Sequence, residues 1–532
     1  MAGGAVAAGG RQTVAAALAI LERGGNAVDA AVAASFVSFI AEIGVVHLGG
    51  SGVAHIYDPQ LGRSLVYDFF SDTPGLGKPK PPLSEMDFAE VSIDFGATTQ
   101  SFFLGRASVA VPGNIFGLWR LAQDHARLPW KALLEPALEV ARNGVLLDTF
   151  QADTCALLAP LYTNTAEMRD IFLRNGRMIE AGEELFVPNL AGTLETLAVE
   201  GAELLRTGAL GQALVADQVA HRGLLTATDL INYQTQRLSS IRLPYRAYEV
   251  LLPPPSSTGG VLTAFSLKLL SAFDVGRLAR GGTEHLRLLY EILAATTRAR
   301  PLWERSSVQM PLPEAIGRFL DDAFVNQYVT EVQAALRDHS ATQAETEQPG
   351  PSNTSHLSVI DDQGMTVSLT TTAGESAGYV VPGTGFIPNN IMGEADLHPG
   401  GFHNRPAGKR IPTMMTPVVV LQDGQPRVAV GSGGSIRIRS AILQVLSNLL
   451  DFGLTLDEAV NAPRVHIEDG VLQCEAGFDP AAVDNLERLG YAVNRWAVRS
   501  IYFGGAHSVS RTPDGRLVGA GDTRRGGYAA VL

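Results

Sequence analysis

The stretch QPGPSNTSHLSVIDDQGMTVSLTTT, residues 348–372, runs from a polar segment with Pro and Gly into two alternating segments joined by DDQG. Alternation of apolar and polar residues with period two predicts two strands, at 355–361 and 365–372. A short polar linker of this kind joins antiparallel strands, here around a turn centred on Gln363. The stretch therefore predicts a β-hairpin that directly follows a loop.

The hairpin predicts a row of hydroxyl groups on one face of a sheet. In an antiparallel pair with this turn, His356 faces Thr370. The same register brings Thr354 opposite Thr372, and residues two positions apart share a face. Threonine is also a common strand residue that pairs across strands for structural reasons alone. The pairing by itself leaves both interpretations open.

The position of Thr354 favours a chemical role. Residues 339–353 contain no large apolar side chain and are expected to form an exposed, mobile loop. A threonine that begins a strand after such a loop can attack the carbonyl carbon of Asn353, and hydrolysis of the resulting ester cuts the chain. The new α-amino group of Thr354 then lies beside its own hydroxyl and, with a pKa near 8, is a suitable base.

An N-terminal nucleophile needs supporting groups, and the sequence offers candidates. Thr372 is expected to hydrogen-bond the oxygen of the nucleophile. The anion of a tetrahedral intermediate needs backbone N–H donors, which glycine presents without steric obstruction. The segment VGSGGS supplies Gly433 and Gly434 after a predicted strand. A turn that enters a helix is the structural alternative for this glycine pair.

The composition is that of an ordinary globular protein. The chain has 532 residues, 46% of them hydrophobic and 18% charged, enough for one large core or two to three domains. The net charge of −13 argues against a nucleic-acid or anionic-membrane partner. The apolar run 30–41 is too short to span a bilayer, and the N-terminus lacks a signal-peptide pattern, so a cytoplasmic protein is expected. The two cysteines form no metal-ligand spacing, and neither a metal nor a cofactor is expected.

The N-terminal region shows clear start and stop signals. A helix over 11–23 ends at Gly24-Gly25, and Asn26 caps a second helix that runs to about residue 42. The segment 47–58 is a glycine-rich turn that leads into a strand, and without a phosphate-loop spacing it predicts a close approach of backbones. The only marked change of composition lies near residue 350. Beyond it we expect strands at 416–421 and 426–431 and helices near 438–452 and 477–489.

Further segments match a known family in the same order along the chain. They are GGNAVDAAVAA (24–34), VPGNIFGLW (111–119), LPPPSSTGG (252–260), TSHLSVIDDQG (354–364), VPGTGFIPNNIM (381–392), GKRIPTMMTP (408–417), GSGGS (431–435) and LDEAVNAPRVH (456–466). On these segments the chain resembles the γ-glutamyltransferase (γ-glutamyltranspeptidase) family of N-terminal nucleophile hydrolases. The resemblance covers nearly the whole chain.

The resemblance implies an α+β fold, a four-layer αββα sandwich formed by both halves of a self-cleaved precursor. The cut would fall between Asn353 and Thr354 and leave a large subunit, 1–353, and a small subunit, 354–532. It makes Thr354 the nucleophile, Thr372 its supporting hydroxyl, and Gly433 and Gly434 the oxyanion hole. The two subunits would form the functional unit, and further dimerisation is open.

The residues expected to hold a glutamyl α-carboxylate depart from the family pattern. Thr99 lies nearest the position of the family's arginine, and Arg106 is the only arginine nearby. The paired serines of the family are matched by Thr413 and Met414. Because one charge-assisted hydrogen bond contributes about 1.5–3 kcal/mol, loss of two such partners predicts much weaker binding of this carboxylate.

The expected partners of the glutamyl α-amino group are also altered. Glu394 matches an acidic residue of the family and is one methylene longer than the usual Asp. An asparagine expected just after the supporting threonine falls at Gly374 and its neighbour Ala373. The amide chemistry is therefore expected to persist while the recognition of the glutamyl group changes.

These observations predict a self-processing threonine amidohydrolase or acyltransferase that acts on a small-molecule amide through a Thr354 acyl-enzyme. One alternative is a hydrolase of a smaller acyl amide, with an oxamate-like or acylase substrate. A second alternative is an unprocessed, non-catalytic scaffold, which would be indicated by loss of Thr354 or of the glycine pair. A metal or serine hydrolase is disfavoured because the chain lacks HExxH and GxSxG motifs.

Overall fold

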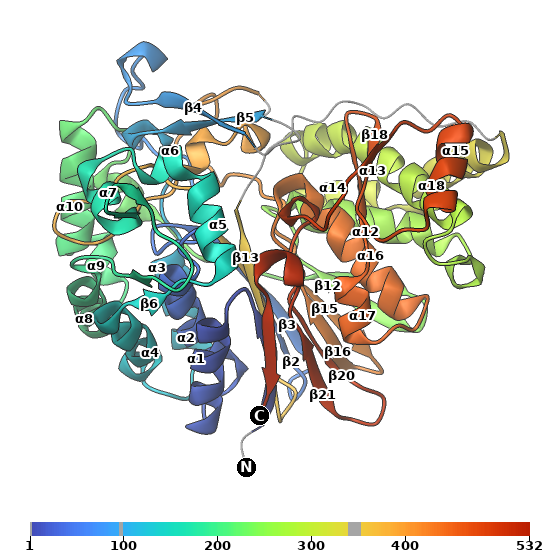
Figure 1. Ribbon diagram of the computed structural model, residues 1–532, viewed down its shortest axis with the longest axis horizontal. Helices are drawn as coiled ribbons and strands as arrows, with labels where there is room; N and C mark the ends of the chain where they lie inside the picture. Colours follow the sequence, from blue (N-terminus) through green and yellow to red (C-terminus); the bar gives the residue numbers. More distant parts are fainter. Residues whose placement is uncertain (1–2, 95–98, 339–352, 399) are drawn as a thin grey trace.

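The computed structural model describes residues 3–94, 99–338, 353–398 and 400–532. Two β-sheets pack face to face at the centre of the molecule, and helices cover the outer side of each sheet (Figure 1). This is the four-layer αββα sandwich that was predicted. Most of the predicted exposed loop, residues 339–352, lies outside the described residues, and Asn353 at its end is buried.

The first sheet combines strands from both sides of residue 350. Its order is β10-β3-β2-β14-β13-β1-β22. The strands are β1 (Gly4–Ala8), β2 (Ser51–Asp58), β3 (Arg63–Phe69), β10 (Gln236–Leu238), β13 (Ser355–Asp361), β14 (Thr366–Thr372) and β22 (Tyr528–Val531). The pairs His356–Thr370 and Ser358–Ser368 confirm the predicted register of the hairpin. The change of composition near residue 350 therefore separates two segments that share one sheet.

The second sheet has the order β11-β12-β15-β16-β20-β21. Its strands are β11 (Ile241–Tyr245), β12 (Tyr248–Leu252), β15 (Val418–Gln422), β16 (Gln425–Val430), β20 (Ser508–Arg511) and β21 (Leu517–Ala520). Small apolar side chains such as Ala5, Ala7 and Ala429 are fully buried in one cluster between the two sheets. Because these side chains are small, the two sheets can approach each other closely at this cluster.

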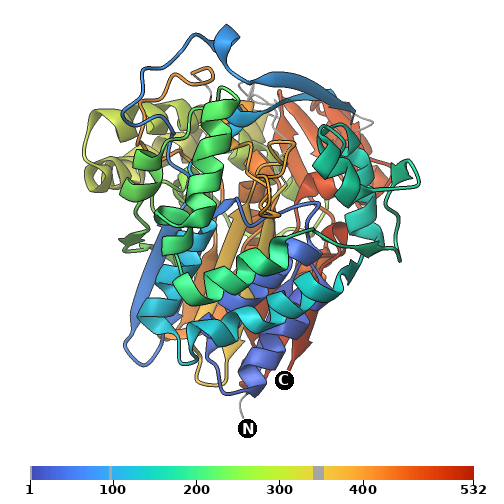
Figure 2. The ribbon, with the colours of Figure 1, turned by 90° about the vertical axis from the view of Figure 1, so that its left-hand side faces the viewer.

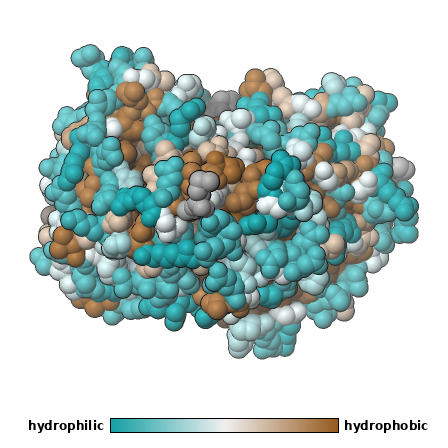
Figure 3. Space-filling model, turned by 90° about the horizontal axis from the view of Figure 1, so that it is seen from below, coloured by the Kyte–Doolittle hydropathy of each residue, from teal (hydrophilic) through white to brown (hydrophobic). Residues whose placement is uncertain are grey.

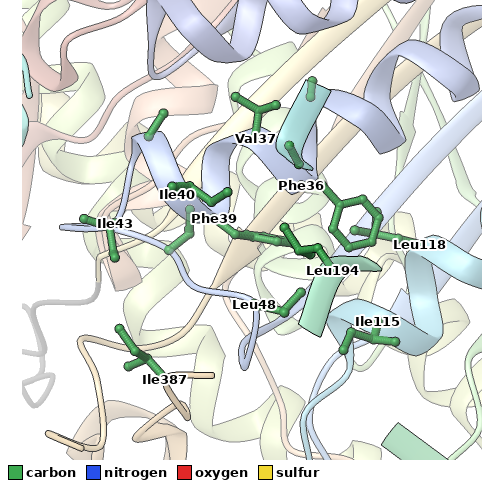
Figure 4. Packing of buried hydrophobic residues seen from close by; sticks show 14 of the residues in the cluster. Phe36, Val37, Phe39, Ile40, Ile43, Leu48, Ile115, Leu118, Leu194 and Ile387 are labelled. Carbon is green, nitrogen blue, oxygen red and sulfur yellow. The ribbon is translucent and has the colours of Figure 1, made fainter. Parts of the chain in front are cut away.

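The two helices that the start and stop signals predicted are α1 (Arg11–Glu22) and α2 (Ala27–Ala41), and both pack against the first sheet. Asn26 caps α2 in a capping box with Asp29. Every residue of α2 is buried, and Figure 4 shows Phe36, Phe39 and neighbouring side chains packed together. Figure 2 shows the helices that lie across the outer face of the first sheet. The further helices of this half are α3 (Asn114–His125), α4 (Trp130–Asn143), α5 (Thr149–Leu157), α6 (Ala159–Tyr162), α7 (Ala166–Phe172), α8 (Leu190–Glu200), α9 (Glu203–Arg206), α10 (Ala209–Ala220) and α11 (Ala227–Asn232).

Helices α12 (Thr258–Ser271) and α16 (Ile438–Leu450) pack together over the second sheet. The other helices of this half are α13 (Thr283–Gln309), α14 (Leu312–Phe319), α15 (Asp322–Asp338), α17 (Leu456–Asn461) and α18 (Pro480–Arg488). The short outlying strands are β4 (Ala89–Asp94), β5 (Thr99–Leu104), β6 (Val145–Leu146), β7 (Leu173–Arg174), β8 (Arg177–Met178), β9 (Glu184–Leu185), β17 (Val465–Glu468), β18 (Val471–Cys474) and β19 (Val493–Arg495). The strands predicted after residue 350 and the helices near 438–452 and 477–489 are confirmed in type.

The surface seen from below is mostly hydrophilic, with hydrophobic residues in small groups (Figure 3). Among the described helices, none is both long enough and apolar enough to cross a membrane. Cys155 and Cys474 are both buried and form no disulfide with each other. The cytoplasmic location stays a prediction.

A buried ionic cluster ties the C-terminal segment to the rest of the second half. Asp522, in a sequence typical of a turn, accepts hydrogen bonds from Arg464 (2.7 Å) and Arg524 (3.1 Å). Glu475 binds the other side of Arg524. Burial alone would raise the pKa of Asp522, but the charges of the two arginines outweigh it and hold that pKa well below its usual range. The turn residue is thus a buried ionic hub.

We expect Asp522→Ala to lower the free energy of unfolding by about 3–5 kcal/mol, because two buried guanidinium groups lose a partner. Urea denaturation followed by circular dichroism measures this change. Asp514→Ala is the matched control, since Asp514 pairs with Arg516 on the exposed surface and its loss changes stability little. Equal losses of stability in the two variants would contradict the role of Asp522 in the buried ionic cluster.

Candidate active site

Thr354 and Thr372 meet at the end of the central hairpin. Thr354 immediately precedes β13, and Thr372 ends the neighbouring strand β14. Gly50 holds the end of β14 close to the next strand, because a Cβ atom there would lie 2.2 Å from the carbonyl oxygen of Thr372. This confirms the predicted close approach of backbones at the glycine-rich turn. A small cavity opens at this point, lined by Phe70, Thr354, Thr372, Glu394, Asp396, Leu397, Thr413, Met414, Met415, Ser435 and Ile438.

The peptide between Asn353 and Thr354 is held on several sides. The Thr372 hydroxyl donates a hydrogen bond of 2.6 Å to the carbonyl oxygen of Asn353 and accepts one of 3.0 Å from Gly374 N–H. The N–H of Asn353 donates to Glu375 Oε1 at 3.1 Å. Thr372 is predicted to hydrogen-bond the hydroxyl of the nucleophile, and in the structure its own hydroxyl donates to the carbonyl group that the nucleophile would attack. Such a donor polarises the carbonyl and stabilises negative charge on its oxygen.

One glycine of the predicted pair, Gly433, lies against Thr354. A Cβ atom on Gly433 would lie 2.1 Å from the carbonyl oxygen of Thr354, so only glycine fits. Gly434 has φ +118°, a conformation that also favours glycine. The Gly433 N–H reaches the carbonyl oxygen of Gly505 at 3.4 Å, which is longer than an ordinary hydrogen bond. Arg525 donates to the Thr354 carbonyl oxygen at 3.3 Å.

Three buried carboxyl groups surround the site. Glu394 and Asp396 line the cavity. Glu375 lies near them and accepts the hydrogen bond from Asn353. Burial raises the pKa of all three, and the negative neighbours raise those of Glu375 and Glu394 further, well above the usual range. One oxygen of each carboxyl group has no hydrogen-bond partner among the described residues. The cluster is therefore suited to a ligand that carries hydrogen-bond donors or a positive charge.

Some of the remaining predicted residues lie at the cavity, and others do not. Thr413 and Met414 line the cavity together with Glu394. Gly374 contacts Glu394 from behind, since a Cβ atom there would lie 2.2 Å from its Oε1 atom. Arg106 takes no part, because it pairs with Asp217 at 3.0 Å. The side chain of Thr99 lies outside the described part of the chain.

The comparisons with known proteins agree with this geometry. The sequence model of the Gamma-glutamyltranspeptidase family matches residues 13–532. The chain belongs to this family. The Acylase ACY 1 proenzyme of Pseudomonas sp. (strain V22) is 33% identical over 518 residues, covering 96% of this chain and 90% of that protein. The Glutathione hydrolase proenzyme of Pseudomonas aeruginosa is 30% identical over 548 residues, covering 97% and 94%.

A solved structure shares the fold of this chain. The crystal structure of cephalosporin acylase from Bacillus halodurans aligns with a TM-score of 0.83 at 23% identity, over 99% of this chain and 96% of that one. Family and fold together make this γ-glutamyltranspeptidase family member an N-terminal nucleophile hydrolase. The described residues contain no group of three or more His, Cys, Asp or Glu suited to a metal ion.

In this family member, Glu42 contacts Ser355, the first residue of β13 and the neighbour of the predicted nucleophile. Its carboxyl group, 1% exposed, accepts hydrogen bonds from Ser355 and from Thr13 (2.5 Å). Burial raises the pKa of Glu42 to about 7, although the two hydroxyl donors lower it and the charge of Asp148 adds a smaller rise. A group that titrates near neutrality therefore contacts the residue that follows Thr354.

Sequence reasoning missed Glu42, Glu375 and Arg525. Glu42 contacts Ser355 across 313 positions of sequence, and Arg525 contacts Thr354 across 171. Glu42 and Arg525 lie in segments with no recognisable spacing to the hairpin. Only the acidic residue close after Thr372 was visible as a signal, because Glu375 lies three positions further along the chain.

We expect Glu42→Gln to change how stability depends on pH. The folded-state pKa of Glu42, about 7, exceeds its ordinary value of 4.5, so the wild type loses stability as pH rises through this interval. The variant lacks this loss. Its free energy of unfolding relative to wild type should therefore rise by about 3 kcal/mol between acidic and slightly alkaline pH.

Urea denaturation of both proteins across this pH range measures the difference. Glu22→Gln, which makes the same substitution at the exposed end of α1, is the matched control. A flat profile for Glu42→Gln would show that Glu42 does not titrate in this window.

Proposed function

We propose that this chain cuts itself between Asn353 and Thr354 and then hydrolyses small amides through Thr354. The observation that carries the proposal is the 2.6 Å hydrogen bond from the Thr372 hydroxyl to the carbonyl oxygen of Asn353. It places a donor on the carbonyl group next to a threonine at the start of a strand, inside a cavity. Residues 1–353 and 354–532 become the large and small subunits.

The cut proceeds in two steps. The Thr354 hydroxyl oxygen adds to the carbonyl carbon of Asn353, and Thr372 stabilises the charge on the carbonyl oxygen. The C–N bond breaks, the amide nitrogen takes up the proton of the hydroxyl, and an ester joins Asn353 to Thr354. Water hydrolyses this ester, which releases the carboxylate of Asn353 and frees the hydroxyl and the α-amine of Thr354.

The same groups then act on a substrate amide. The α-amine of Thr354 accepts the proton of its hydroxyl, which attacks the substrate carbonyl and forms an acyl-enzyme. The N–H groups of Gly433 and Gly434 supply donors for the oxyanion, helped by the freed Thr372 hydroxyl. The amine product leaves with the proton, and water or an acceptor amine removes the acyl group. The two subunits stay together because their strands alternate within the first sheet.

The acyl group is small or extended, in contrast to a classical glutamyl group. Thr413 and Met414 stand where a glutamyl-binding site needs paired hydroxyl donors, and Arg106 is occupied by Asp217. The similarity to an acylase proenzyme supports hydrolysis of an acyl amide.

A second candidate is γ-glutamyl hydrolysis or transfer. The buried carboxyl groups of Glu375, Glu394 and Asp396 would bind a substrate ammonium group, and the similarity to a glutathione hydrolase proenzyme supports this reading. Faster turnover of γ-glutamyl-p-nitroanilide than of butyryl-p-nitroanilide would favour this candidate.

We expect wild-type protein to give two fragments whose masses correspond to residues 1–353 and 354–532, and Thr354→Ala to stay a single chain. The alanine variant lacks the attacking oxygen. Intact-mass spectrometry of the purified proteins measures the result. Thr354→Ser, which keeps a hydroxyl, is the matched control and should be cut. A single intact chain in folded wild type would overturn the proposal.

Thr372→Val should slow self-cleavage by about 100- to 1,000-fold, the usual effect of losing one oxyanion donor. Valine has nearly the same shape but cannot donate to the carbonyl oxygen of Asn353. A gel time course after cell-free synthesis follows the appearance of the fragments. Thr372→Ser keeps the donor and should be cut at a rate much closer to wild type. Equal rates for the valine and serine variants would remove Thr372 from the mechanism.

A further inference from the structure

A second, larger cavity adjoins the one at Thr354. It has a volume of about 360 Å³ and is lined in part by Asp396, Leu397, Thr413 and Met414, which also line the small cavity. A volume of this size is typical of sites for small molecules. A substrate whose amide reaches Thr354 therefore has room for the rest of its body in the larger cavity.

Much of the wall of the larger cavity is apolar. Trp303 and Val308 from α13 and Leu312 from α14 form one side, and Leu397 and Met414 form part of the other. Ser256 adds a hydroxyl oxygen that is buried and has no hydrogen-bond partner among the described residues. The cavity suits an apolar chain or ring that carries a polar group.

The charges around the larger cavity are unevenly paired. Arg410 lies between Asp68 (3.0 Å) and Asp72 (2.7 Å), which makes it part of an ion-pair network. Arg300 pairs with Glu304 at 2.7 Å. Neither guanidinium group needs a ligand to balance its charge.

Arg405 differs from these two arginines. Within the described ranges it has no ion pair, and its Nε atom is buried without a hydrogen-bond partner. Burial lowers its pKa. A guanidinium group that is partly removed from water without an anion is unfavourable, so a bound anion would stabilise it.

Lysine side chains lie on the other side of Arg405. Arg405 also lines an adjacent cavity of about 280 Å³, together with Lys78 and Lys80. The Nζ atoms of the two lysines donate to the backbone carbonyl oxygens of Gly223 and His403, which carry no charge. The residues described as lining this cavity include no Asp or Glu. On this side of Arg405 an anion would meet the two lysines and no carboxylate among the described lining residues, whereas the larger cavity on the other side includes Asp396 and Glu304, the latter paired with Arg300.

We propose that Arg405 binds a carboxylate carried by the amide substrate, so that the enzyme acts on anionic acyl amides. The substrate's apolar body lies in the larger cavity, and its amide reaches Thr354. A guanidinium–carboxylate pair in this setting is a charge-assisted, bidentate interaction. The inference rests on the proposed amide hydrolysis and adds the class of substrate. The carboxylate belongs to the acyl part or to the amine part, and suitable substrates separate the two.

The test compares kcat and KM for charged and neutral amides on the purified, cleaved enzyme. Succinyl-, glutaryl- and adipyl-p-nitroanilide carry the carboxylate on the acyl part, and N-butyryl-4-aminobenzoate carries it on the amine part. Butyryl-p-nitroanilide is the neutral reference. The variants are Arg405→Ala, Arg405→Lys and, as a matched control, Arg305→Ala, which removes an exposed arginine from the same side of the molecule.

We expect Arg405→Ala to lower kcat/KM for the best charged substrate by about 10- to 100-fold, mainly through KM, since a charge-assisted bond is lost. Turnover of butyryl-p-nitroanilide should not change, and Arg405→Lys should recover part of the loss. A loss confined to the ω-carboxyacyl series assigns the carboxylate to the acyl part, and a loss confined to the aminobenzoate assigns it to the amine part.

The inference is overturned if wild type shows no preference for any charged substrate, or if Arg405→Ala affects charged and neutral substrates equally. The inference is also overturned if Arg305→Ala lowers kcat/KM for the charged substrates as much as Arg405→Ala does. Thermal unfolding of each variant identifies a misfolded protein, in which case Arg405→Lys alone decides. If wild type hydrolyses no amide at all, the proposed function fails. Calorimetric titration with adipate still tests Arg405 then, because binding should be present in wild type and lost in Arg405→Ala.

Discussion

The pairing of β13 with β14 is the constraint on which the site depends. The register that places His356 opposite Thr370 also brings the residue before β13 to the end of β14. On the other side, β14 pairs with β2, with Thr372 opposite Ser51. A slip of one residue would turn every side chain of the strand to the other face of the sheet. The bond between Thr372 and the Asn353 carbonyl would then be lost.

The same pairing creates a buried polar layer beneath the site. His356 bonds to Thr370 (2.8 Å) and to Ser358 (2.9 Å), so that both ring nitrogens have partners. Burial holds the pKa of His356 well below its usual range, and the ring is neutral. The row of hydroxyl groups thus combines both interpretations of the sequence. Within the strands its members are structural, and at the strand ends they reach the Asn353–Thr354 peptide.

Burial governs the electrostatics throughout the site. Carboxyl groups without a cationic partner, such as Glu42 and Glu394, have raised pKa values, whereas Asp522 between arginines has a lowered one. The contrast follows from the balance between loss of hydration and nearby opposite charge. The larger cavity has the unpartnered carboxyl oxygen of Asp396 where it adjoins the small cavity and the unpaired Arg405 elsewhere in its wall, so its polarity changes along its length. Such a gradient favours one orientation of a charged substrate.

Local patterns in the sequence by themselves determined the hairpin, the capped helix α2, the glycine approach at Gly50 and the order of the family segments. These features depend on residues close together in the chain, whose periodicity and turn chemistry need no distant partner. Only the tertiary structure decided what surrounds Asn353, which was expected in an exposed loop and is buried against Glu375 and Gly44. It likewise decided which arginines are neutralised. Contacts across hundreds of residues depend on how the two sheets and their helices pack, and no local pattern encodes that packing.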